Sequence, residues 1–318
     1  EPVAPVSVGD VIADKYRIDR ILGVGGMGYV VAATHLQIDQ RVAIKFVRSG
    51  VQSAGAGDSG ERLMREARAA AKLRSEHVTR VYDVGHLPHG HPQGGTSFIV
   101  MELVEGRELS KIVDDSRGGL PVPDAVEYVL QVCAALVEAH AAGIVHRDLK
   151  PQNLVLARRI QGTPLVKVLD FGIAKDTSGL GEEAKSLTDS SVVLGSPLYM
   201  SPEQMRGGRD VSPRTDLWAV GVMLYQFLSG ALPFDAPTVP ELCVKVLTLD
   251  PPPLLGVAPH VPPVLAAIVE RCLQKEPQLR FSSAAELAAH LEPFSRSAER
   301  GMMDRPWRSL AETVDSGG

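Results

Sequence analysis

The sequence HRDLKPQN at residues 146–153 is the stretch that best indicates the fold and the functional site of this chain. It places a carboxylate, an ammonium group and a carboxamide close together, on Asp148, Lys150 and Asn153. A carboxylate can orient a hydroxyl group and accept its proton, an ammonium group can neutralise an anion, and an amide oxygen can bind a hard metal ion. The alternative is a polar surface loop without chemistry, and the order and spacing of the other motifs in the chain argue against it.

The composition is that of an ordinary globular protein, with 318 residues, 44% hydrophobic and 22% charged, and a net charge of -5. This length predicts two domains or one large one. The charge gives no sign of nucleic-acid binding, and no apolar run is long enough to span a membrane. Cys133, Cys243 and Cys272 are expected to be buried, reduced thiols in a cytoplasmic protein. Since the chain begins without Met, we expect it to be part of a longer protein.

A glycine-rich stretch, GVGGMGYV at residues 23–30, follows an alternating, strand-like segment at residues 16–22. Glycines spaced as G-x-G-x-x-G let backbone N–H groups approach phosphates closely. Dinucleotide-binding turns share this spacing, but a helix opens at the third glycine of those turns. Residues 29–35 are instead β-prone, so the stretch is predicted to join two antiparallel strands.

The segment VAIK at residues 42–45 places Lys45 in an apolar strand, which is costly unless the charge is paired. The expected partners are nucleotide phosphates and a glutamate on a helix predicted over about residues 61–73. Glu66 is preferred because it lies in the middle of that helix. Glu61 and Glu76 are expected to be solvated charges near its ends.

Further along, strands are predicted at residues 78–84 and 96–101, joined by a His-rich loop interpreted as an exposed hairpin rather than a metal site. Helices dominate after about residue 109, and a long one is predicted over residues 123–142, ended by Gly143. An apolar strand then leads to DFG at residues 170–172. Asp170 and Asn153 supply the hard oxygen ligands that Mg²⁺ prefers.

Three later features bear on the site. Residues 176–194 are rich in Ser, Thr, Gly and Asp, as in a mobile loop. Asp216 opens a predicted buried helix, where an aspartate is usually the cap. The tail after about Pro293 lacks clear structure, although residues 306–310 can dock on the body.

Together these motifs resemble the protein kinases from residue 16 to about 291. The segments VMELVEG at 100–106, HRDLKPQN at 146–153 and LGSPLYMSPEQ at 194–204 are similar to bacterial "eukaryotic-like" Ser/Thr kinases. The resemblance implies a two-lobed α+β fold. It comprises a flexible lead-in (1–15), an N-terminal lobe with an antiparallel sheet and one main helix (16–104), a larger, mostly helical C-terminal lobe (105–293) and a tail or linker (294–318).

The resemblance also implies an activity, the transfer of the γ-phosphate of ATP to Ser/Thr hydroxyls of protein substrates with Mg²⁺, or alternatively Mn²⁺. Asp148 is then the catalytic base and Lys150 contacts the γ-phosphate, while Lys45, held by Glu66, positions the other phosphates. Asn153 and Asp170 are the metal ligands. The implied nucleotide-binding residues are Gly23, Val24, Gly25, Gly26, Met27, Gly28, Val30, Ala43, Lys45, Met101, Glu102, Val104 and Val155.

Regulation and partners follow from the same resemblance. It implies autophosphorylation at Thr188, Ser190 and Ser191, a salt bridge between Arg280 and Glu203, and homodimers paired through the N-terminal lobe. It also implies that Asp216 ties down the backbone of the loop at 146–153, a second interpretation that is compatible with the helix cap. Two other functions were weighed. A pseudokinase scaffold would have lost Lys45, Asp148, Asn153 or Asp170, and all four are intact. A dinucleotide-dependent oxidoreductase is suggested only by the glycine-rich stretch.

Overall fold

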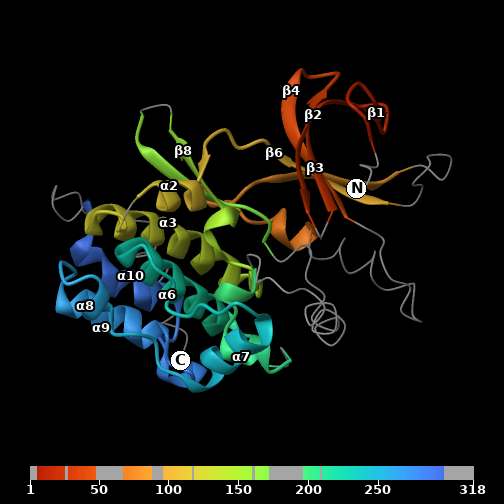
Figure 1. Cartoon of the computed structure of the whole chain (residues 1–318). Helices are drawn as coiled ribbons and strands as arrows, with labels where there is room; N and C mark the ends of the chain where they lie inside the picture. Colours follow the sequence, from red (N-terminus) through yellow and green to blue (C-terminus); the bar gives the residue numbers. More distant parts are fainter. Residues whose placement is uncertain are drawn as a thin grey trace, which may run out of the picture. The chain divides into compact units, whose positions relative to one another are not determined.

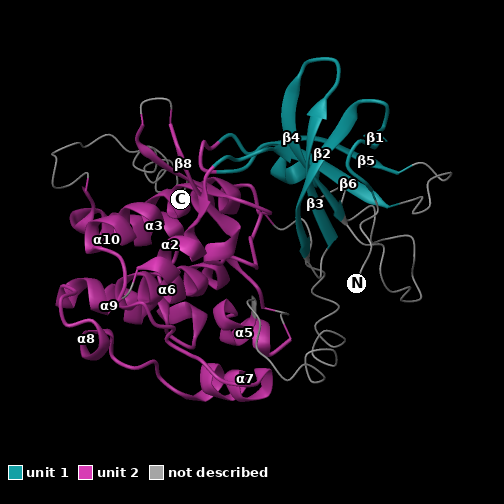
Figure 2. Ribbon diagram, turned by 45° about the horizontal axis from the view of Figure 1, so that its top comes forward, with its two compact units in different colours: residues 1–74, 78–105 teal, residues 75–77, 106–318 magenta. Residues whose placement is uncertain are grey.

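The computed structural model describes residues 6–25, 28–47, 67–87, 96–116, 118–159, 162–171, 196–207 and 210–296. The chain divides into two compact units, which are coloured separately in Figure 2. Unit 1 comprises residues 1–74 and 78–105, and unit 2 comprises residues 75–77 and 106–318.

Unit 1 is built on a six-stranded antiparallel sheet with the strand order β1-β2-β3-β4-β6-β5 (Figure 1). Alternate apolar residues of the central strands, such as Val31 and Ala33 of β3 and Ile44 and Phe46 of β4, share one buried cluster, as the two-residue period of a strand requires. The strands are β1 (Val11–Ile12), β2 (Tyr16–Gly25), β3 (Gly28–His35), β4 (Gln40–Val47), β5 (Val81–His86) and β6 (Ser97–Glu102).

The beginning of the chain is more ordered than a flexible lead-in. Val6 and Ile12 are each only 3% exposed and belong to the core cluster of the sheet. Two backbone hydrogen bonds of 2.9 Å, from Gly9 to Ile18 and from Ile18 to Asp10, fix the segment against β2. The prediction for residues 6–15 was therefore wrong, because two isolated apolar anchors in a short segment produce no periodicity to detect.

Unit 2 is mostly helical, with a small antiparallel sheet of order β7-β8-β9. Its strands are β7 (Arg107–Glu108), β8 (Leu154–Arg158) and β9 (Pro164–Val168). Its α-helices are α2 (Leu109–Asp115), α3 (Val122–Ala141), α5 (Pro202–Met205), α6 (Pro213–Ser229), α7 (Val239–Thr248), α8 (Leu254–Val257), α9 (Pro263–Cys272) and α10 (Ala284–Leu291). Short 3-10 turns are η1 (Pro151–Asn153), η3 (Ser196–Tyr199), η4 (Pro277–Leu279) and η5 (Glu292–Phe294).

Helices α3 and α6 form the centre of unit 2 and carry the residues that hold the loop at 146–153. Along α3, Ala125, Val129, Val132 and Leu136 are all fully buried at the predicted helical spacing. Gly143 follows the helix with φ +74°, the left-handed conformation that glycine adopts easily after a helix end. Helix α6 is buried almost throughout, so both helices are fixed by packing.

The start of α6 corrects one alternative for Asp216. Ser212 is the N-cap residue, Pro213 follows it, and the Ser212 N–H donates to Thr215 Oγ1 over 3.3 Å. Asp216 lies within the first turn instead, where a negative charge suits the helix dipole but caps no N–H group. The cap interpretation of Asp216 was wrong, and its carboxylate can therefore accept hydrogen bonds from outside the helix.

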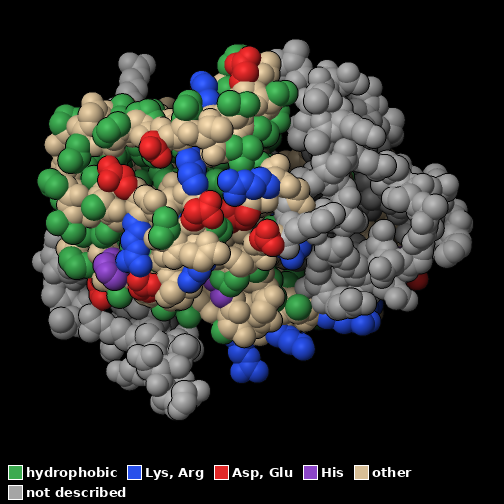
Figure 3. Space-filling model, turned by 90° about the horizontal axis from the view of Figure 1, so that it is seen from below, with side chains coloured by type: hydrophobic (Ala, Val, Ile, Leu, Met, Phe, Trp, Pro, Cys, Tyr) green, Lys and Arg blue, Asp and Glu red, His purple; other side chains and the backbone are tan. Residues whose placement is uncertain are grey.

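The end of the described chain also differs from the predicted tail. Residues 294–296 pack on unit 2, since Ser295 is fully buried and Arg296 forms an ion pair with Asp124 of α3. Residues 306–310, for which a linker was preferred over docking on the body, lie outside the described residues. On the face of the molecule drawn in Figure 3, acidic and basic side chains lie next to one another rather than gathering by sign.

The cysteines are free thiols, of which two are buried as predicted and Cys243 is half-buried. Burial raises the pKa of Cys133 to about 12, so this thiol stays protonated and unreactive.

Candidate active site

The three polar residues of the loop at 146–153 converge on one another. The Lys150 Nζ donates to Asp148 Oδ2 over 3.0 Å. The Asn153 Nδ2 donates to the Asp148 carbonyl oxygen over 2.8 Å and lies 3.3 Å from Asp148 Oδ2. The single turn of η1 folds Asn153 back towards Asp148, so the spacing of these two residues brings their side chains together. The carboxylate is thus oriented by its two neighbours, one of which is a cation.

Asp216 holds the backbone just before this carboxylate, which confirms the second interpretation of that residue. Its Oδ2 accepts the His146 N–H and its Oδ1 accepts the Arg147 N–H, each over 2.9 Å. The Nε2 of His140, on α3, donates to the same Oδ2 over 2.8 Å. Asp216 is 1% exposed, so these bonds do not compete with bulk water. Two helices therefore fix the position of the loop.

His146 connects the loop to the segment that ends in Asp170. Its Nδ1 accepts the Asp148 N–H over 3.3 Å, which assigns the ring proton to Nε2, and Nε2 donates to the Leu169 carbonyl over 2.9 Å. The imidazole also contacts the ring of Phe171, with centroids 4.9 Å apart. The Leu169 N–H donates to the Asn153 carbonyl over 2.9 Å, so the two segments are joined directly.

Two residues of the site have left-handed backbones that non-glycine residues rarely adopt, with φ +67° at Arg147 and +58° at Asp170. Such conformations cost about 1–3 kcal/mol each and persist only where the surroundings fix them, typically at functional sites. Arg147 directly precedes Asp148, and Asp170 is the first residue of the DFG triplet. Among the described residues Ala13, Asp14 and Asp39 also have positive φ, so the conformation is not confined to the site.

The oxygen atoms of Asn153 and Asp170 suit a hard divalent cation. Because the Asn153 amide nitrogen donates to Asp148, its oxygen is the atom turned to other partners. Asp170 adds a carboxylate from the adjoining segment. No cluster of three or more His, Cys, Asp or Glu residues suited to a metal lies in the described part of the chain. A site of this kind would be completed by substrate phosphates and water, as magnesium sites usually are.

Behind the site, Arg280 binds Glu203 at the start of α5. Two parallel hydrogen bonds join the guanidinium to the carboxylate, at 2.8 and 2.9 Å. Thr215 Oγ1 donates to the same carboxylate over 2.8 Å. Burial alone would raise the pKa of Glu203, but the hydrogen bonds and charge of Arg280 hold the pKa below its usual value. The predicted salt bridge is confirmed.

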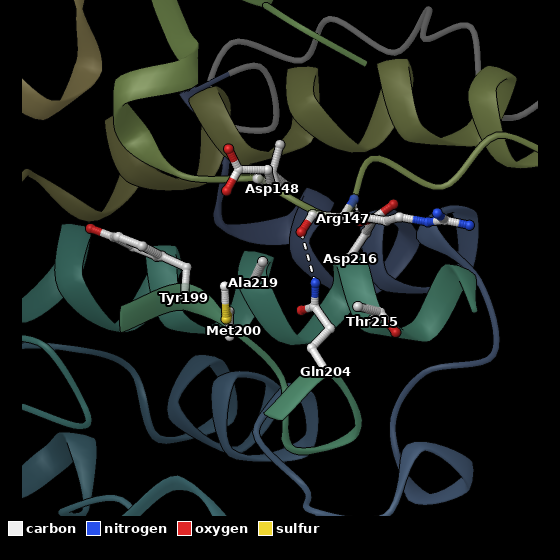
Figure 4. Close-up of a pocket in the computed structure, with 9 residues that line it drawn as sticks. Arg147, Asp148, Tyr199, Met200, Gln204, Thr215, Asp216 and Ala219 are labelled. Atoms are coloured by element: carbon white, nitrogen blue, oxygen red, sulfur yellow. Dashed lines mark hydrogen bonds between the residues drawn. The ribbon is translucent and has the colours of Figure 1, made fainter. Parts of the chain in front are cut away.

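Sequence reasoning missed two residues of this network, His140 and Gln204. Gln204 Nε2 donates to the Arg147 carbonyl over 2.7 Å, drawn as the dashed line in Figure 4. His140 is the polar position on the otherwise apolar face of α3, and that interruption is the signal that should have drawn attention. Gln204 is buried and stands three residues after Ser201, the spacing of a capping box, and this local pattern is the signal that could have found it.

In unit 1 the glycine-rich stretch joins antiparallel strands, with Gly25 opposite Gly28. This overturns the dinucleotide-binding alternative, which required a helix after Gly28. Lys45 is only 5% exposed, and its strand neighbours are Val30 on β3 and Ile99 on β6.

Other predicted nucleotide-binding residues of unit 1 lie on the same strands. Ala43 lies opposite Met101, at 6% and 7% exposure, and Glu102 ends β6. Val155 lies in β8 of unit 2, opposite Lys167. Several predicted site residues fall outside the described residues, namely Gly26, Met27, Glu66, Thr188, Ser190 and Ser191.

The similarity of this chain to known proteins identifies its family. The family model described as "Protein kinase domain" matches residues 16–291. The chain belongs to the protein kinase family. Family membership implies ATP as the phosphoryl donor, use of a divalent metal ion and protein side chains as acceptors.

Bacterial kinases are among the proteins similar to this kinase domain. "Serine/threonine-protein kinase pkn3" of Myxococcus xanthus is 39% identical over 308 residues, which cover 96% of this chain and 54% of the relative. "Serine/threonine-protein kinase PknA" of Mycobacterium tuberculosis is 34% identical over 313 residues, 98% of this chain and 69% of that one. The crystal structure of the Mycobacterium tuberculosis PknI kinase domain matches with a TM-score of 0.69 and 27% identity, covering 91% of this chain and 100% of that chain.

These similarities confirm the predicted resemblance to bacterial Ser/Thr kinases and the α+β kinase fold. The kinase domain spans about half the length of the first of these relatives. Among the described residues, no helix combines the length and apolar character needed to cross a membrane.

Proposed function

We propose that this chain is the catalytic domain of an active Ser/Thr protein kinase that uses ATP with Mg²⁺, or alternatively Mn²⁺. The observation that carries the proposal is the convergence of Lys150 and Asn153 on Asp148, on a loop whose backbone Asp216 holds at two N–H groups. Phosphoryl transfer needs positioning and charge stabilisation more than covalent chemistry from the protein, and this loop is built for both.

In the proposed reaction, the substrate hydroxyl oxygen forms a bond to the γ-phosphorus of ATP while the bond from that phosphorus to the bridging oxygen of ADP breaks. The hydroxyl proton goes to Asp148. Lys150, 3.0 Å from Asp148, neutralises charge on the transferring phosphoryl group. Asn153 and Asp170 hold the metal ion, which supplies charge neutralisation at the phosphate oxygens when bound.

On the nucleotide side, the proposal assigns Lys45 to the α- and β-phosphates with Glu66 as its partner. The glycine-rich stretch, residues 23–28 with Val30, covers the phosphates. Ala43, Met101 and Val155 line the adenine site, where the backbones of Glu102 and Val104 hydrogen-bond the base. Lys45, Ala43 and Met101 lie on the paired strands β4 and β6 of one sheet, which supports assigning them to one site.

Two features support Ser and Thr as acceptors. Lys150 follows Asp148 by two positions, a residue run that the resemblance associates with Ser/Thr rather than Tyr substrates. The relatives that match the chain are named as serine/threonine-protein kinases. The scaffold alternative, a pseudokinase without catalysis, is disfavoured because Lys45, Asp148, Asn153 and Asp170 are all present.

Three finer points belong to the same proposal. The domain phosphorylates itself at Thr188, Ser190 and Ser191, where Arg147, Lys175 and Arg62 are the candidate cations for the phosphates. It acts in the cytoplasm. Two copies pair through unit 1, in the manner that the family resemblance implies.

Radiolabelled ATP tests the proposal. The purified protein is incubated with γ-labelled ATP, Mg²⁺ and a generic basic protein substrate, and the labelled amino acids are identified after hydrolysis. The proposal predicts labelled phosphoserine and phosphothreonine. Absence of label with Mg²⁺ and with Mn²⁺, or label on tyrosine alone, would overturn it.

A further inference from the structure

We propose that Gln204 is a positioning residue for catalysis, whose side-chain amide fixes the peptide plane that leads into Asp148. The inference rests on the proposed kinase activity. It assigns a role in the active site to a residue of α5, which directly follows the segment from DFG to Glu203. Gln204 contacts no reacting atom, so its effect is carried through the backbone of Arg147.

Arg147 has a left-handed backbone conformation. A φ of +67° is unfavourable for a residue with a Cβ atom, so the conformation must be fixed from outside. Asp216 Oδ1 accepts the N–H of Arg147 over 2.9 Å. Gln204 Nε2 donates to its carbonyl oxygen over 2.7 Å. The two bonds hold both ends of Arg147, and the second one belongs to the peptide unit that Arg147 shares with Asp148.

The two ends of the Gln204 carboxamide have separate tasks. Its Oε1 accepts the Ser201 N–H over 3.1 Å, which is half of a capping box at the start of α5. Its Nε2 makes the bond to Arg147. Because the oxygen is engaged, the amide orientation is determined, and the nitrogen cannot turn away from Arg147 without losing the cap. The side chain is 8% exposed, which keeps water from competing.

The helix that carries Gln204 is itself held in place. Its neighbour Glu203 receives two hydrogen bonds from Arg280 and one from Thr215, at 2.8 to 2.9 Å. A rigid element therefore presents the donor to Arg147. Rigid support of this kind is what separates a positioning group from a fortuitous contact, because an error of 1 Å in placement can cost about 10²-fold in rate.

A small cavity of about 10 Å³ adjoins the bond and is lined by residues that include Asp148, Gln204 and Asp216 (Figure 4). This is space for about one water molecule. Replacing Gln204 by alanine would enlarge the cavity and let water reach the Arg147 carbonyl, which would mask the loss of the donor. Gln204→Glu is the sharper test, because glutamate has the same shape and keeps the acceptor.

Glutamate at this position preserves the cap, since it is the usual partner residue of a capping box. It removes the donor and sets a carboxylate oxygen against the Arg147 carbonyl. We expect the transfer rate kcat to fall about 10- to 100-fold. The KM for ATP should stay within about twofold, because the predicted nucleotide contacts do not involve Gln204. The melting temperature should fall as well, because the new carboxylate is buried and has no countercharge, so kcat is measured at a temperature where the variant is still folded.

Two variants serve as controls. Gln226→Glu makes the same chemical change beside the same region, but Gln226 Oε1 only accepts, from the Tyr199 hydroxyl over 2.7 Å, and glutamate retains that role. It should leave kcat unchanged. Ser201→Ala removes the other half of the capping box, the 3.4 Å bond from the Gln204 N–H to Ser201 Oγ, and should lower stability without a matching loss of kcat.

The kcat and melting temperature of Gln204→Glu and Ser201→Ala distinguish a positioning role of Gln204 from a purely structural one. A fall in kcat for Gln204→Glu at unchanged KM, measured where the variant is folded and absent from Ser201→Ala at an equal loss of stability, supports the inference. A wild-type kcat in Gln204→Glu overturns it, and so does a loss of kcat that merely parallels a loss of stability shared with Ser201→Ala. If the wild-type protein itself transfers no phosphate in the same assay, the proposed kinase function is wrong. That result differs from a failure of the Gln204 proposal alone, in which the wild type is active and Gln204→Glu is equally active.

Discussion

Arg280 and Glu203 form a bidentate ion pair in the interior of unit 2, with side-chain exposures of 0% and 5%. The remaining guanidinium hydrogens donate to the carbonyl groups of Gln274, Arg214 and Lys275, at 2.8 to 3.1 Å. A buried charge pair is tolerated only with such complete hydrogen bonding. The pair joins the start of α5 to the chain beyond α9, so the position of α5 depends on it.

Arg280→Ala should lower the stability of the protein severely. Removing the guanidinium leaves the Glu203 carboxylate buried without its countercharge, and we expect a loss of about 3–5 kcal/mol in the free energy of unfolding. Urea titration followed by circular dichroism measures this loss. Activity should fall as well, since α5 presents Gln204 to Arg147.

Arg159→Ala is the matched control. Arg159 also forms a bidentate pair, with Glu76 at 2.9 and 2.6 Å, but these side chains are 29% and 54% exposed. Its removal should cost about 1 kcal/mol or less. If Arg280→Ala and Arg159→Ala lost equal free energy of unfolding, burial of the ion pair would not determine how much it stabilises the protein.

The pair also predicts how stability depends on pH. The pKa of Glu203 is lower in the folded protein than its usual value of 4.5, so the folded state favours the ionised form. The stabilisation is complete above pH 4.5 and is lost as the pH falls through the folded pKa. The stability gap between the wild type and Glu203→Gln should therefore be constant from pH 7 to about 5 and narrow below 4.5. A gap that widens on acidification would contradict the assignment.

Asp216→Asn should impair catalysis by loosening the loop that bears Asp148. The carboxylate accepts the N–H groups of His146 and Arg147 with different oxygens, and asparagine offers only one acceptor. The amide nitrogen would face a backbone N–H group. We expect kcat to fall about 10- to 100-fold, measured by steady-state label transfer.

Asp124→Asn provides the comparison for that variant. Asp124 is likewise an aspartate in the first turn of a helix, but its partner is Arg296, which is 48% exposed. Its kcat should match the wild type. If Asp216→Asn retained wild-type kcat too, the hold on the catalytic loop would be dispensable.

Much of the site was predictable because its residues lie in short motifs with fixed chemistry. Asp148, Lys150 and Asn153 fall within one loop, where a single 3-10 turn brings them together. The Arg280–Glu203 pair and the tie from Asp216 were expected from the family resemblance, and both are present.

What the sequence did not reveal depends on contacts between distant positions. Gln204 and Arg147 are joined by a side-chain bond that no periodicity encodes. In the sequence His140 lies on an apolar helix face, and its role follows only from the hydrogen bond to Asp216, which is 76 residues away. The burial of Val6 likewise follows from the sheet that it packs on, and the cap of α6 was misassigned because Ser212 with Pro213 is a stronger helix start than Asp216.

The activation prediction concerns Thr188, Ser190 and Ser191. Phosphatase-treated protein should regain phosphate at these positions on incubation with Mg·ATP, seen by mass spectrometry of peptides, since a phosphate can bind cations such as Arg147 and order the segment. The triple alanine variant should transfer phosphate to substrate more slowly than the wild type. Equal rates for the two proteins would place any switch elsewhere.

The most direct test of the central claim compares the wild type with Asp148→Asn at saturating Mg·ATP. Asparagine keeps the shape of the side chain but cannot accept the substrate proton. Both proteins should bind ATP with similar affinity, and only the wild type should transfer the γ-phosphate at a substantial rate, with kcat lower in the variant by about 10²-fold or more. If both proteins bind ATP and transfer phosphate at the same rate, Asp148 is not the base. If both bind ATP and neither transfers it, the chain is a scaffold and not a kinase.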